Sequence, residues 1–234
     1  MPPKTASRPA ARRLPRDQRV AVILQTARTV LRDRGSEQFL TSEVAERCGT
    51  SEATIYKYFP TKKDLLVKAA EDWFDDFLSD DYPARTGGPL KDRLYHAIWW
   101  GLSFIRREPA LSRFVLMEVR ADPDYRSMRI YRQNRQVVDR VMAIVEEGRK
   151  SGIVRDDVPL RLMRDMIFGA IEHQTWAYLR GEGDFSVDDS AGWITDVILG
   201  GIIVTQPADR QLAEAVAILE DVTASLKKRV GSGG

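Results

Sequence analysis

The sequence is poor in cysteine, in histidine and in long hydrophobic runs. A single cysteine, Cys48, among 234 residues excludes an internal disulfide. The two histidines, His96 and His173, are too few for a histidine-rich metal site, so we expect no metal and no cofactor. No apolar run approaches the ~20 residues that span a bilayer, and no secretory signal precedes the first helix. These absences predict a cytoplasmic protein without a membrane partner.

Catalytic motifs are also missing. The sequence contains no G-x-S-x-G, no phosphate-binding glycine loop, no H-E-x-x-H and no cysteine–histidine set. The paired carboxylates Glu146-Glu147 and Asp188-Asp189 lie at predicted helix ends, where solvated charge is the ordinary expectation. We therefore expect that the protein is not an enzyme.

The net charge of +2 hides an uneven distribution. Residues 1–68 hold 14 Lys and Arg against 7 Asp and Glu, and the remainder holds 22 against 27. A basic N-terminal third on an acidic body is expected where one end binds a polyanion, although a basic tail without a partner gives the same asymmetry. Residues 1–15 contain four prolines and no apolar period, so they are predicted to form a disordered basic arm, and residues 231–234 a flexible tail.

Apolar residues between these ends recur at three- and four-residue steps, which predicts an all-α protein with no internal repeat. Helices are expected at 16–34, 41–48, 51–58, 62–77, 90–107, 109–120, 125–150, 159–180, 187–205 and 208–229. The predicted organisation is a helix-turn-helix domain over 16–68 and a larger helical domain over 69–230. Their boundary near 68–77 is expected to run through one continuous helix.

The stretch 41–59 has the pattern of a helix-turn-helix. Thr41 and Ser51 are the expected N-caps of two short helices, and Gly49 between them permits a sharp turn with positive φ. A small core is expected from Ile23, Ala27, Leu31, Val44, Cys48, Ile55 and Phe59.

The outer face of the third helix is the predicted DNA-reading surface; it consists of Glu52, Ala53, Thr54, Tyr56, Lys57 and Tyr58. Short side chains come first, so the N-terminal end can approach the floor of a major groove. Thr54 suits a base edge or a phosphate, and the tyrosine hydroxyls suit phosphate oxygens. Lys62 lies at the start of the next helix, where the helix dipole favours binding of a phosphate. The alternative is a bundle in which the tyrosines merely pack.

The arginines of the arm, Arg12, Arg13 and Arg16, leave two interpretations open. They suit an adjacent minor groove or phosphates, as in the arms of other helix-turn-helix proteins. A solubilising tail explains them equally well.

Residues 49–65, GTSEATIYKYFPTKKDL, resemble the signature of TetR-family transcriptional regulators. Upstream, Thr26-Ala27, Gly35, Thr41, Val44 and Ala45 keep the family's spacing, so the resemblance covers about residues 18–68. It implies that Thr41 and Ser42 face the DNA backbone, and that Thr54, Tyr56, Lys57 and Tyr58 are recognition contacts with Lys62 as a phosphate anchor. Glu52 departs from the family's pattern; it either accepts from cytosine N4 or favours the helix N-terminus.

The resemblance also implies a helical body that dimerises and binds a small-molecule effector. Segments 159–180 and 187–205 are apolar on more than one face, so one face is left for a partner. Four such helices from two chains would make a symmetric homodimer bundle. A buried hairpin in a monomer is the alternative.

Aromatic and polar residues of the body are candidates for an effector pocket, although ordinary core is the alternative for each. The first set is Phe77, Trp100, Phe104, Met117, Phe168, Glu172 and Trp176; Trp73, Trp99, Glu118, Arg120, His173 and Gln174 are further candidates. Residues 166–172, MIFGAIE, are similar to a segment of TetR-family members that respond to fatty acyl-CoA, which suggests a long apolar ligand. We therefore expect a ligand-released repressor that binds an inverted-repeat DNA operator, or, failing an inducer, a constitutive DNA-binding protein.

Overall fold

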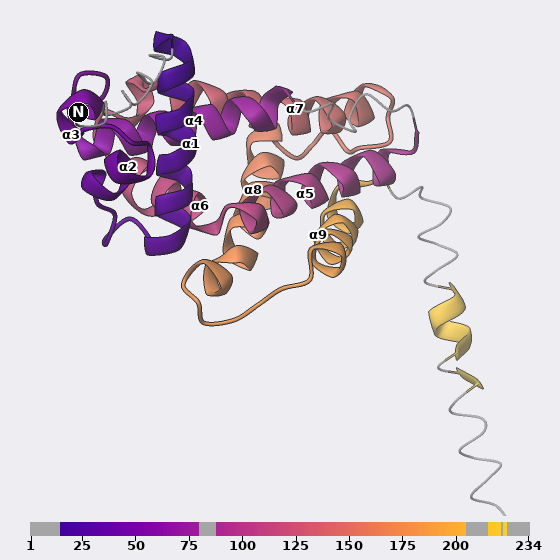
Figure 1. Cartoon of the computed structure of the whole chain (residues 1–234). Coiled ribbons are helices and arrows are strands. Elements are labelled where there is room, and N and C mark those ends of the chain that lie inside the picture. The colour runs from indigo at the N-terminus through magenta and orange to yellow at the C-terminus, as the bar shows by residue number, and fades with distance from the viewer. Residues whose placement is uncertain (1–14, 80–87, 205–214, 221, 224–234) are drawn as a thin grey trace, which may run out of the picture.

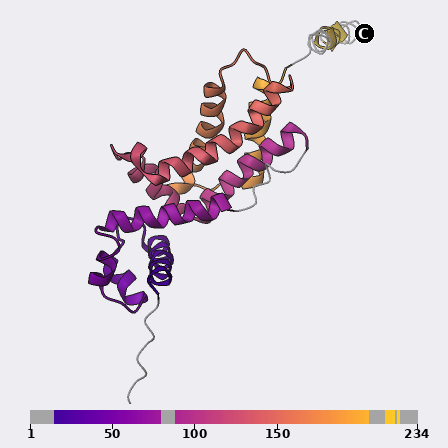
Figure 2. The ribbon, with the colours of Figure 1, turned by 90° about the horizontal axis from the view of Figure 1, so that it is seen from above.

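The computed structural model describes residues 15–79, 88–204, 215–220 and 222–223, and these fold into helices that form a head and a body (Figures 1 and 2). The elements are α1 (Arg16–Arg34), α2 (Thr41–Arg47), α3 (Glu52–Tyr56), α4 (Lys62–Ser79), α5 (Leu90–Arg107), α6 (Pro109–Phe114), the π-helix η2 (Val115–Val119), the 3₁₀-helix η3 (Tyr125–Ser127), α7 (Arg129–Lys150), α8 (Leu160–Leu179) and α9 (Val187–Ile202). The all-α prediction is confirmed. Within the described ranges, extended pairing is limited to one bridge between Val154 and Ile203.

Helices α1, α2 and α3 form the head at one end of the molecule, and α5, α7, α8 and α9 form the body at the other (Figure 2). The continuous helix α4 contacts α1 of the head and α7 of the body, and α6 also packs on α1. In the body, α5 packs along α9, and α8 lies beside α9 (Figure 1). Helices α4 and α6 therefore contact both the head and the body.

Side-chain caps define the starts of α3 and α4. The Ser51 hydroxyl accepts a hydrogen bond from the Thr54 amide at 3.2 Å, as expected for an N-cap. Before α4, the Thr61 hydroxyl accepts from the Asp64 amide and the Asp64 carboxylate accepts from the Thr61 amide, both at 3.0 Å. This reciprocal pair is a capping box, and it fixes the point where the recognition region ends and α4 begins.

The prediction that Thr41 caps α2 is wrong. The N-cap is Leu40 and it makes no side-chain cap bond, while Thr41 is the first helical residue and only 6% exposed. The chain enters the helix one residue earlier than expected, so the Thr41 side chain packs inward. The start of α2 is therefore fixed by packing of Thr41 and not by a side-chain cap.

Several predicted helices differ in detail from the observed ones. The helix expected over 109–120 changes register after Phe114 into η2, where the Arg120 amide donates to the Val115 carbonyl at 2.9 Å. The helix expected over 51–58 ends at Tyr56, and the one expected over 125–150 starts with the separate turn η3. Apolar spacing over five residues cannot distinguish i→i+4 from i→i+5 bonding.

Some sequence predictions fall outside the described residues. Residues 1–14 of the basic arm, most of the helix expected over 208–229, and the 231–234 tail belong to this group. Residues 215–220 and 222–223 are helical and exposed, including Val216 and Leu219 of the predicted apolar stripe.

Two apolar clusters form the core. The first joins α1–α4 to α6 and η2, and it contains the predicted Ile23, Ala27, Leu31, Val44, Ile55 and Phe59, with Cys48 half-buried against it. The second joins α5, α7, α8 and α9. Because Val115 and Val119 of η2 belong to the first cluster, the core of the head continues into the wall of the body.

No helix in the described part of the chain is both long and apolar enough to cross a lipid bilayer. Among the same residues, no cluster of His, Cys, Asp and Glu side chains is suited to a metal ion.

Candidate DNA-binding surface and ligand cavity

The α2–α3 unit has the geometry of a helix-turn-helix. Gly49 takes φ of 63°, and the Thr50 amide donates to the Ala45 carbonyl at 2.9 Å, which closes the turn. Ile55 is fully buried in α3 and Phe59 is buried just after it. These two side chains pack one face of α3 against the apolar core of the head, so the opposite face points outward.

The outward face carries most of the predicted DNA contacts. Ser42, Glu52, Ala53, Tyr56 and Lys57 are exposed; Thr54, Tyr58 and Lys62 are partly exposed, and Thr41 is buried. The structure therefore brings the candidates of α3 and its following turn to one surface, and it withdraws the side chain of Thr41 from that surface.

Tyr58 lies in a cationic cleft of about 480 Å³ lined by Arg16, Arg19, Thr54, Lys57 and Tyr58. The Arg19 guanidinium donates to the Tyr58 hydroxyl at 3.2 Å, and the Arg16 guanidinium lies 5.9 Å from the ring centroid. Among the residues that the structure describes, no carboxylate lines this cleft, so it suits a phosphate group. Arg19 was missed from the sequence, although its spacing of three from Arg16 places both on one side of α1.

Lys62 is partly engaged by the head itself. Its ammonium donates to the Ser36 carbonyl at 2.8 Å and lies 5.6 Å from the Phe39 ring centroid. One of its three N–H donors is thus used, and the lysine is held at the start of α4 near the recognition turn.

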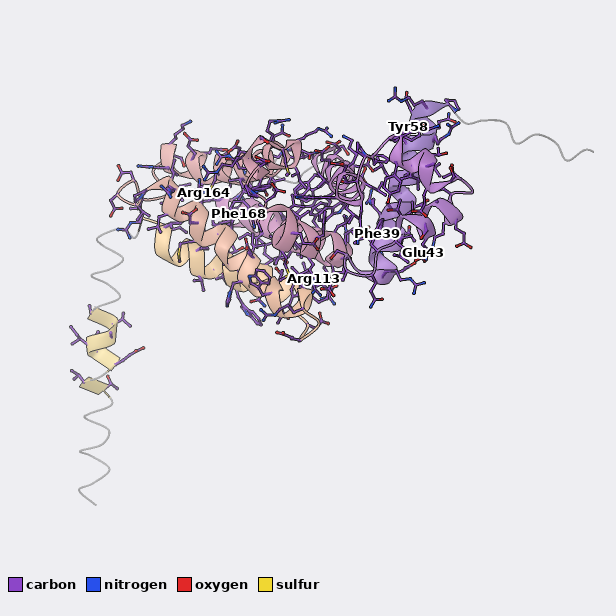
Figure 3. All side chains as sticks on the ribbon, turned by 90° about the vertical axis from the view of Figure 1, so that its left-hand side faces the viewer. Phe39, Glu43, Tyr58, Arg113, Arg164 and Phe168 are labelled. Atoms are coloured by element: carbon purple, nitrogen blue, oxygen red, sulfur yellow. The ribbon has the colours of Figure 1, made fainter. Side chains whose placement is uncertain are left out.

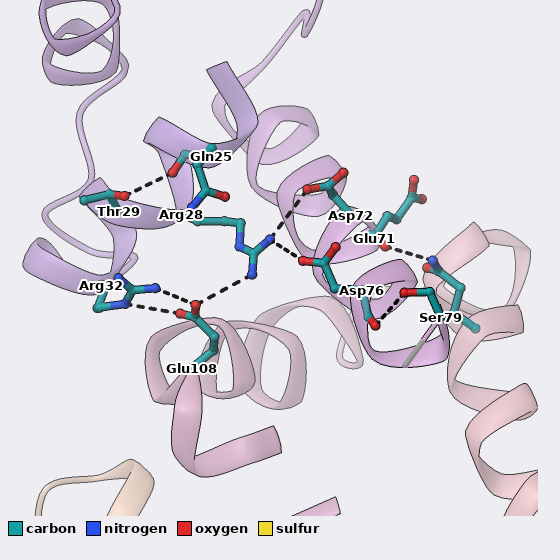
Figure 4. Close-up of polar contacts among 10 residues, drawn as sticks. Gln25, Arg28, Thr29, Arg32, Glu71, Asp72, Asp76, Ser79 and Glu108 are labelled. Atoms are coloured by element: carbon teal, nitrogen blue, oxygen red, sulfur yellow. Dashed lines mark hydrogen bonds and ion pairs between the residues drawn. The ribbon is translucent and has the colours of Figure 1, made fainter. Parts of the chain in front are cut away.

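Ion pairs join the head to the body (Figure 4). The Arg28 guanidinium of α1 lies 2.7 Å from the Asp76 carboxylate and 3.6 Å from Asp72 on α4, and 3.7 Å from Glu108 at the start of α6. Arg32 also pairs with Glu108, which is buried. Burial, reinforced by the neighbouring Asp76 charge, raises the pKa of Asp72. The junction of α1, α4 and α6 is therefore densely charged.

The segment that starts at Glu108 and ends at Asp122, which we call the linking segment, also has an ion pair at its second end. Lys63, in the first turn of α4, pairs with Asp122, two residues after Arg120. The hydrogen bonds that Asp122 accepts from Lys63 and from the Asp124 amide lower its pKa. The linking segment is thus bound to α1 through Glu108 and to the start of α4 through Asp122.

A cavity of about 620 Å³ lies in the body between α4, α5, η2, α7 and α8. Aromatic rings form part of its wall: the Phe104 ring stacks on Trp73 with 3.8 Å between centroids, and it is tilted against Phe77 with 4.1 Å between centroids. Aliphatic side chains supply most of the remaining apolar lining, namely Ile98, Ile105, Val115, Leu116, Val137, Val138, Val141 and Ile171. Such a mainly apolar hollow has the size of a small-molecule site.

Four residues of the first predicted ligand set line this cavity, namely Phe77, Phe104, Phe168 and Glu172. Three lie outside its lining. Trp100 packs behind Phe77 and beneath Arg107, Met117 is 43% exposed, and Trp176 lies under Arg180. The difference arises from helix rotation, which apolar spacing alone leaves undetermined.

Trp73 and Arg120 from the further candidates also line the cavity, whereas His173, Gln174 and Glu118 are exposed outside its lining. Sequence reasoning missed the other charged lining residues, namely Arg126, Arg135, Arg161, Arg164 and Asp165. Figure 3 shows Arg164 and Phe168 near one end of the molecule and Tyr58 near the other. The cavity and the DNA-reading surface are thus distinct and well separated.

Helices α8 and α9 leave an apolar face uncovered. Trp193 is 65% exposed and Val197 is 72% exposed on α9, and Leu162 and Met166 are exposed on α8. Open space surrounds the Cβ position of Gly169, Gly200 and Gly201. Large apolar side chains exposed in one region mark an interaction surface.

Comparison with known proteins identifies both parts of the chain. Residues 23–69 match the family described as bacterial regulatory proteins, tetR family, and residues 87–202 match a tetracyclin repressor-like C-terminal domain.

Individual relatives match over most of the chain. The fatty acid metabolism regulator protein of Bacillus subtilis is 22% identical over 77% of this chain and 93% of its own length. The HTH-type transcriptional repressor KstR2 of Mycolicibacterium smegmatis is 25% identical over 88% of this chain and 98% of its own. The crystal structure of the transcriptional regulator FadR from Bacillus subtilis in complex with stearoyl-CoA shares the fold, with a TM-score of 0.67 and 23% identity over 78% of this chain and 98% of that one.

Family members are DNA-binding regulators and not enzymes; they bind DNA as dimers and respond to small-molecule effectors. The two matched domains, the helix-turn-helix geometry and the shared fold agree: the chain belongs to the TetR family of transcriptional regulators.

Proposed function

We propose that this protein is a repressor that binds an inverted-repeat operator as a homodimer and is released from DNA by a ligand with a long apolar chain, such as a fatty acyl-CoA. The observation that carries the proposal is the position of the cavity. Val115 of the linking segment lines the cavity and also belongs to the core of the head.

The DNA contacts follow from the outward face of α3 and the cleft beside it. Thr54 is the candidate for a base edge in the major groove, and Lys57 and Tyr56 are candidates for phosphates. Tyr58 holds the Arg19 guanidinium in the cleft, so a phosphate there meets two fixed guanidinium groups and a lysine. Ser42, Glu52, Ala53 and Lys62 complete the proposed surface. We assign Thr41, whose side chain is buried, at most a contact through its backbone.

The dimer is proposed to form through the exposed apolar faces of α8 and α9. Two copies related by a twofold axis would bury Trp193, Val197, Leu162 and Met166 in a four-helix bundle. The glycines on these helices permit close approach of the two backbones. Two recognition helices about 34 Å apart would then read matching half-sites of an inverted repeat.

Two observations support a ligand with an acyl chain. The wall of the cavity is largely aromatic and aliphatic, so burial of a hydrocarbon chain there is favourable. The relatives also include a fatty acid metabolism regulator and a regulator bound to stearoyl-CoA.

Release from DNA follows from the linking segment. A ligand against Val115 and Leu116 displaces η2, and the ion pairs of Glu108 and Asp122 carry that displacement to α1 and α4. The ligand thereby favours a dimer geometry in which the two heads no longer match the operator. Because DNA and ligand favour different states, each weakens the binding of the other.

The test is a titration of the protein–operator complex with palmitoyl-CoA below its micelle concentration, followed by fluorescence anisotropy of the labelled DNA. Phe168→Asp places a carboxylate in the apolar lining, so it should raise the ligand concentration needed for release at least tenfold while leaving DNA affinity unchanged. Ile153→Ala, at an exposed apolar residue outside the cavity lining and outside the linking segment, is the control and should leave release unchanged. DNA that stays bound at saturating acyl ligand would favour a constitutive DNA-binding protein.

A further inference from the structure

The charged side of the cavity is unexpected for a site that holds only hydrocarbon. Five arginines line it, namely Arg120, Arg126, Arg135, Arg161 and Arg164, against two carboxylates, Asp165 and Glu172. A hydrocarbon chain gains nothing from these cations, and a single carboxylate is satisfied by one guanidinium. The excess of cations therefore calls for a ligand that carries several negative charges.

We propose that this cavity recognises its effector by a phosphate-bearing headgroup, held by Arg126, Arg135, Arg161 and Arg164, while the aromatic hollow takes the chain. The inference rests on the proposed function, since it takes this cavity as the effector site. It adds that the headgroup, and not the chain alone, sets the affinity.

Arg120 is excluded from this headgroup site because it is already neutralised. Its guanidinium lies 2.7 Å from the Glu172 carboxylate. This pair belongs to the wall where η2 meets α8, and it offers little net charge to a ligand.

The other four arginines retain a net positive charge. Arg161 and Arg164 share one carboxylate, Asp165, at 3.8 and 2.7 Å. Arg135 lies 3.6 Å from Asp139, which is outside the cavity lining. Arg126 has no ion-pair or hydrogen-bond partner within the part of the chain that the structure describes. Because exposed ion pairs contribute little, their arginines can exchange a carboxylate for a phosphate at small cost.

The positions of these arginines fit a headgroup at the edge of the cavity. Arg161 and Arg164 lie in the first turns of α8, two turns and one turn before Phe168, whose ring is part of the apolar wall. Arg135 lies on α7, beside the lining residues Val137 and Val138. Charged and apolar lining are thus adjacent along both helices, as an amphiphile with a charged end requires. Guanidinium groups also match phosphate oxygens in a bidentate manner.

The experiment compares three probes by calorimetry on the full-length protein: palmitoyl-CoA, palmitate and coenzyme A alone. Palmitoyl-CoA should bind at least tenfold more tightly than palmitate, and its advantage should shrink as salt is raised. The double variant Arg161→Gln/Arg164→Gln should lose at least tenfold in palmitoyl-CoA affinity and leave palmitate affinity unchanged. Both side chains are outside the core, Arg161 being 84% exposed, so the fold should persist.

Arg180→Gln is the matched control, because this arginine follows the same helix, is exposed and is absent from the cavity lining. It should change neither affinity. Equal binding of palmitoyl-CoA and palmitate, with no effect of the double variant, would overturn the headgroup proposal and leave the proposed function standing. Coenzyme A alone binding as tightly as palmitoyl-CoA would overturn it also, since the chain would then be irrelevant. If neither palmitoyl-CoA nor palmitate binds, both proposals fail.

Discussion

Trp193→Ala should separate the two subunits if the α8–α9 face forms the dimer. Trp193 is 65% exposed in the single chain, so roughly 130 Å² of its surface is available to a partner. At about 25 cal/mol per Å², burial of this surface contributes about 3 kcal/mol to dimer formation. Because the dimer is twofold symmetric, Trp193 of each subunit makes this contribution. After allowance for the alanine that remains, the dimer should weaken by about 5 kcal/mol, or ~4 × 10³-fold in dissociation constant.

The assay is sedimentation of fluorescently labelled protein over a nanomolar to micromolar range. Wild type is expected to stay dimeric across this range, and Trp193→Ala should become monomeric within it. Val22→Ala, also at an exposed apolar residue but on α1, is the control and should remain dimeric. An unchanged dissociation constant for Trp193→Ala, or a monomeric wild type, would refute the assigned interface.

Three further predictions concern the head and its attachment. Ser51→Ala removes the cap of α3 and should lower the free energy of unfolding by about 1 kcal/mol in urea denaturation, whereas no change would argue against the cap. Ile55→Ala, at a fully buried site, should cost about 2–5 kcal/mol and abolish specific DNA binding; full stability would contradict the packing of α3. Asp122→Asn removes the Lys63 ion pair and should lower the melting temperature. Since the pKa of Asp122 is lowered in the folded protein, its stabilisation is present above about pH 4 and is lost as pH falls through the lowered pKa. The difference in melting temperature between wild type and Asp122→Asn should therefore be constant from pH 5 to 8 and shrink below about pH 4. If this difference changes between pH 6 and 8, titration of Asp122 is not its cause.

Local signals in the sequence were enough to predict the helix-turn-helix. Ser51, Gly49 and the apolar spacing around Ile55 act within a few residues of one another, so their effect does not depend on the rest of the fold. The bounds of α5 were predicted correctly for the same reason, because Pro89 precedes the helix and its apolar period is regular. The inward position of Thr41 depends on how α2 packs on α1, and it was missed.

The cavity was predictable only in part. Phe77 and Phe104 were identified as ring-bearing residues on regular helices, but Trp100 has the same pattern and packs behind them. Which ring faces the hollow depends on the rotation of α5 against α4 and α7. The four lining arginines come from three elements, with Arg126 on η3, Arg135 on α7, and Arg161 and Arg164 on α8, and only the folded chain brings them to one cavity.

The most direct test of the central claim is selection of bound DNA from a random pool by the full-length protein, repeated with Thr54→Ala. Wild type should enrich an inverted repeat with two matching half-sites, and Thr54→Ala should relax the preference at one base-pair position of each half-site. An absence of any enriched motif, or a motif without twofold symmetry, would contradict DNA recognition by a dimer through α3.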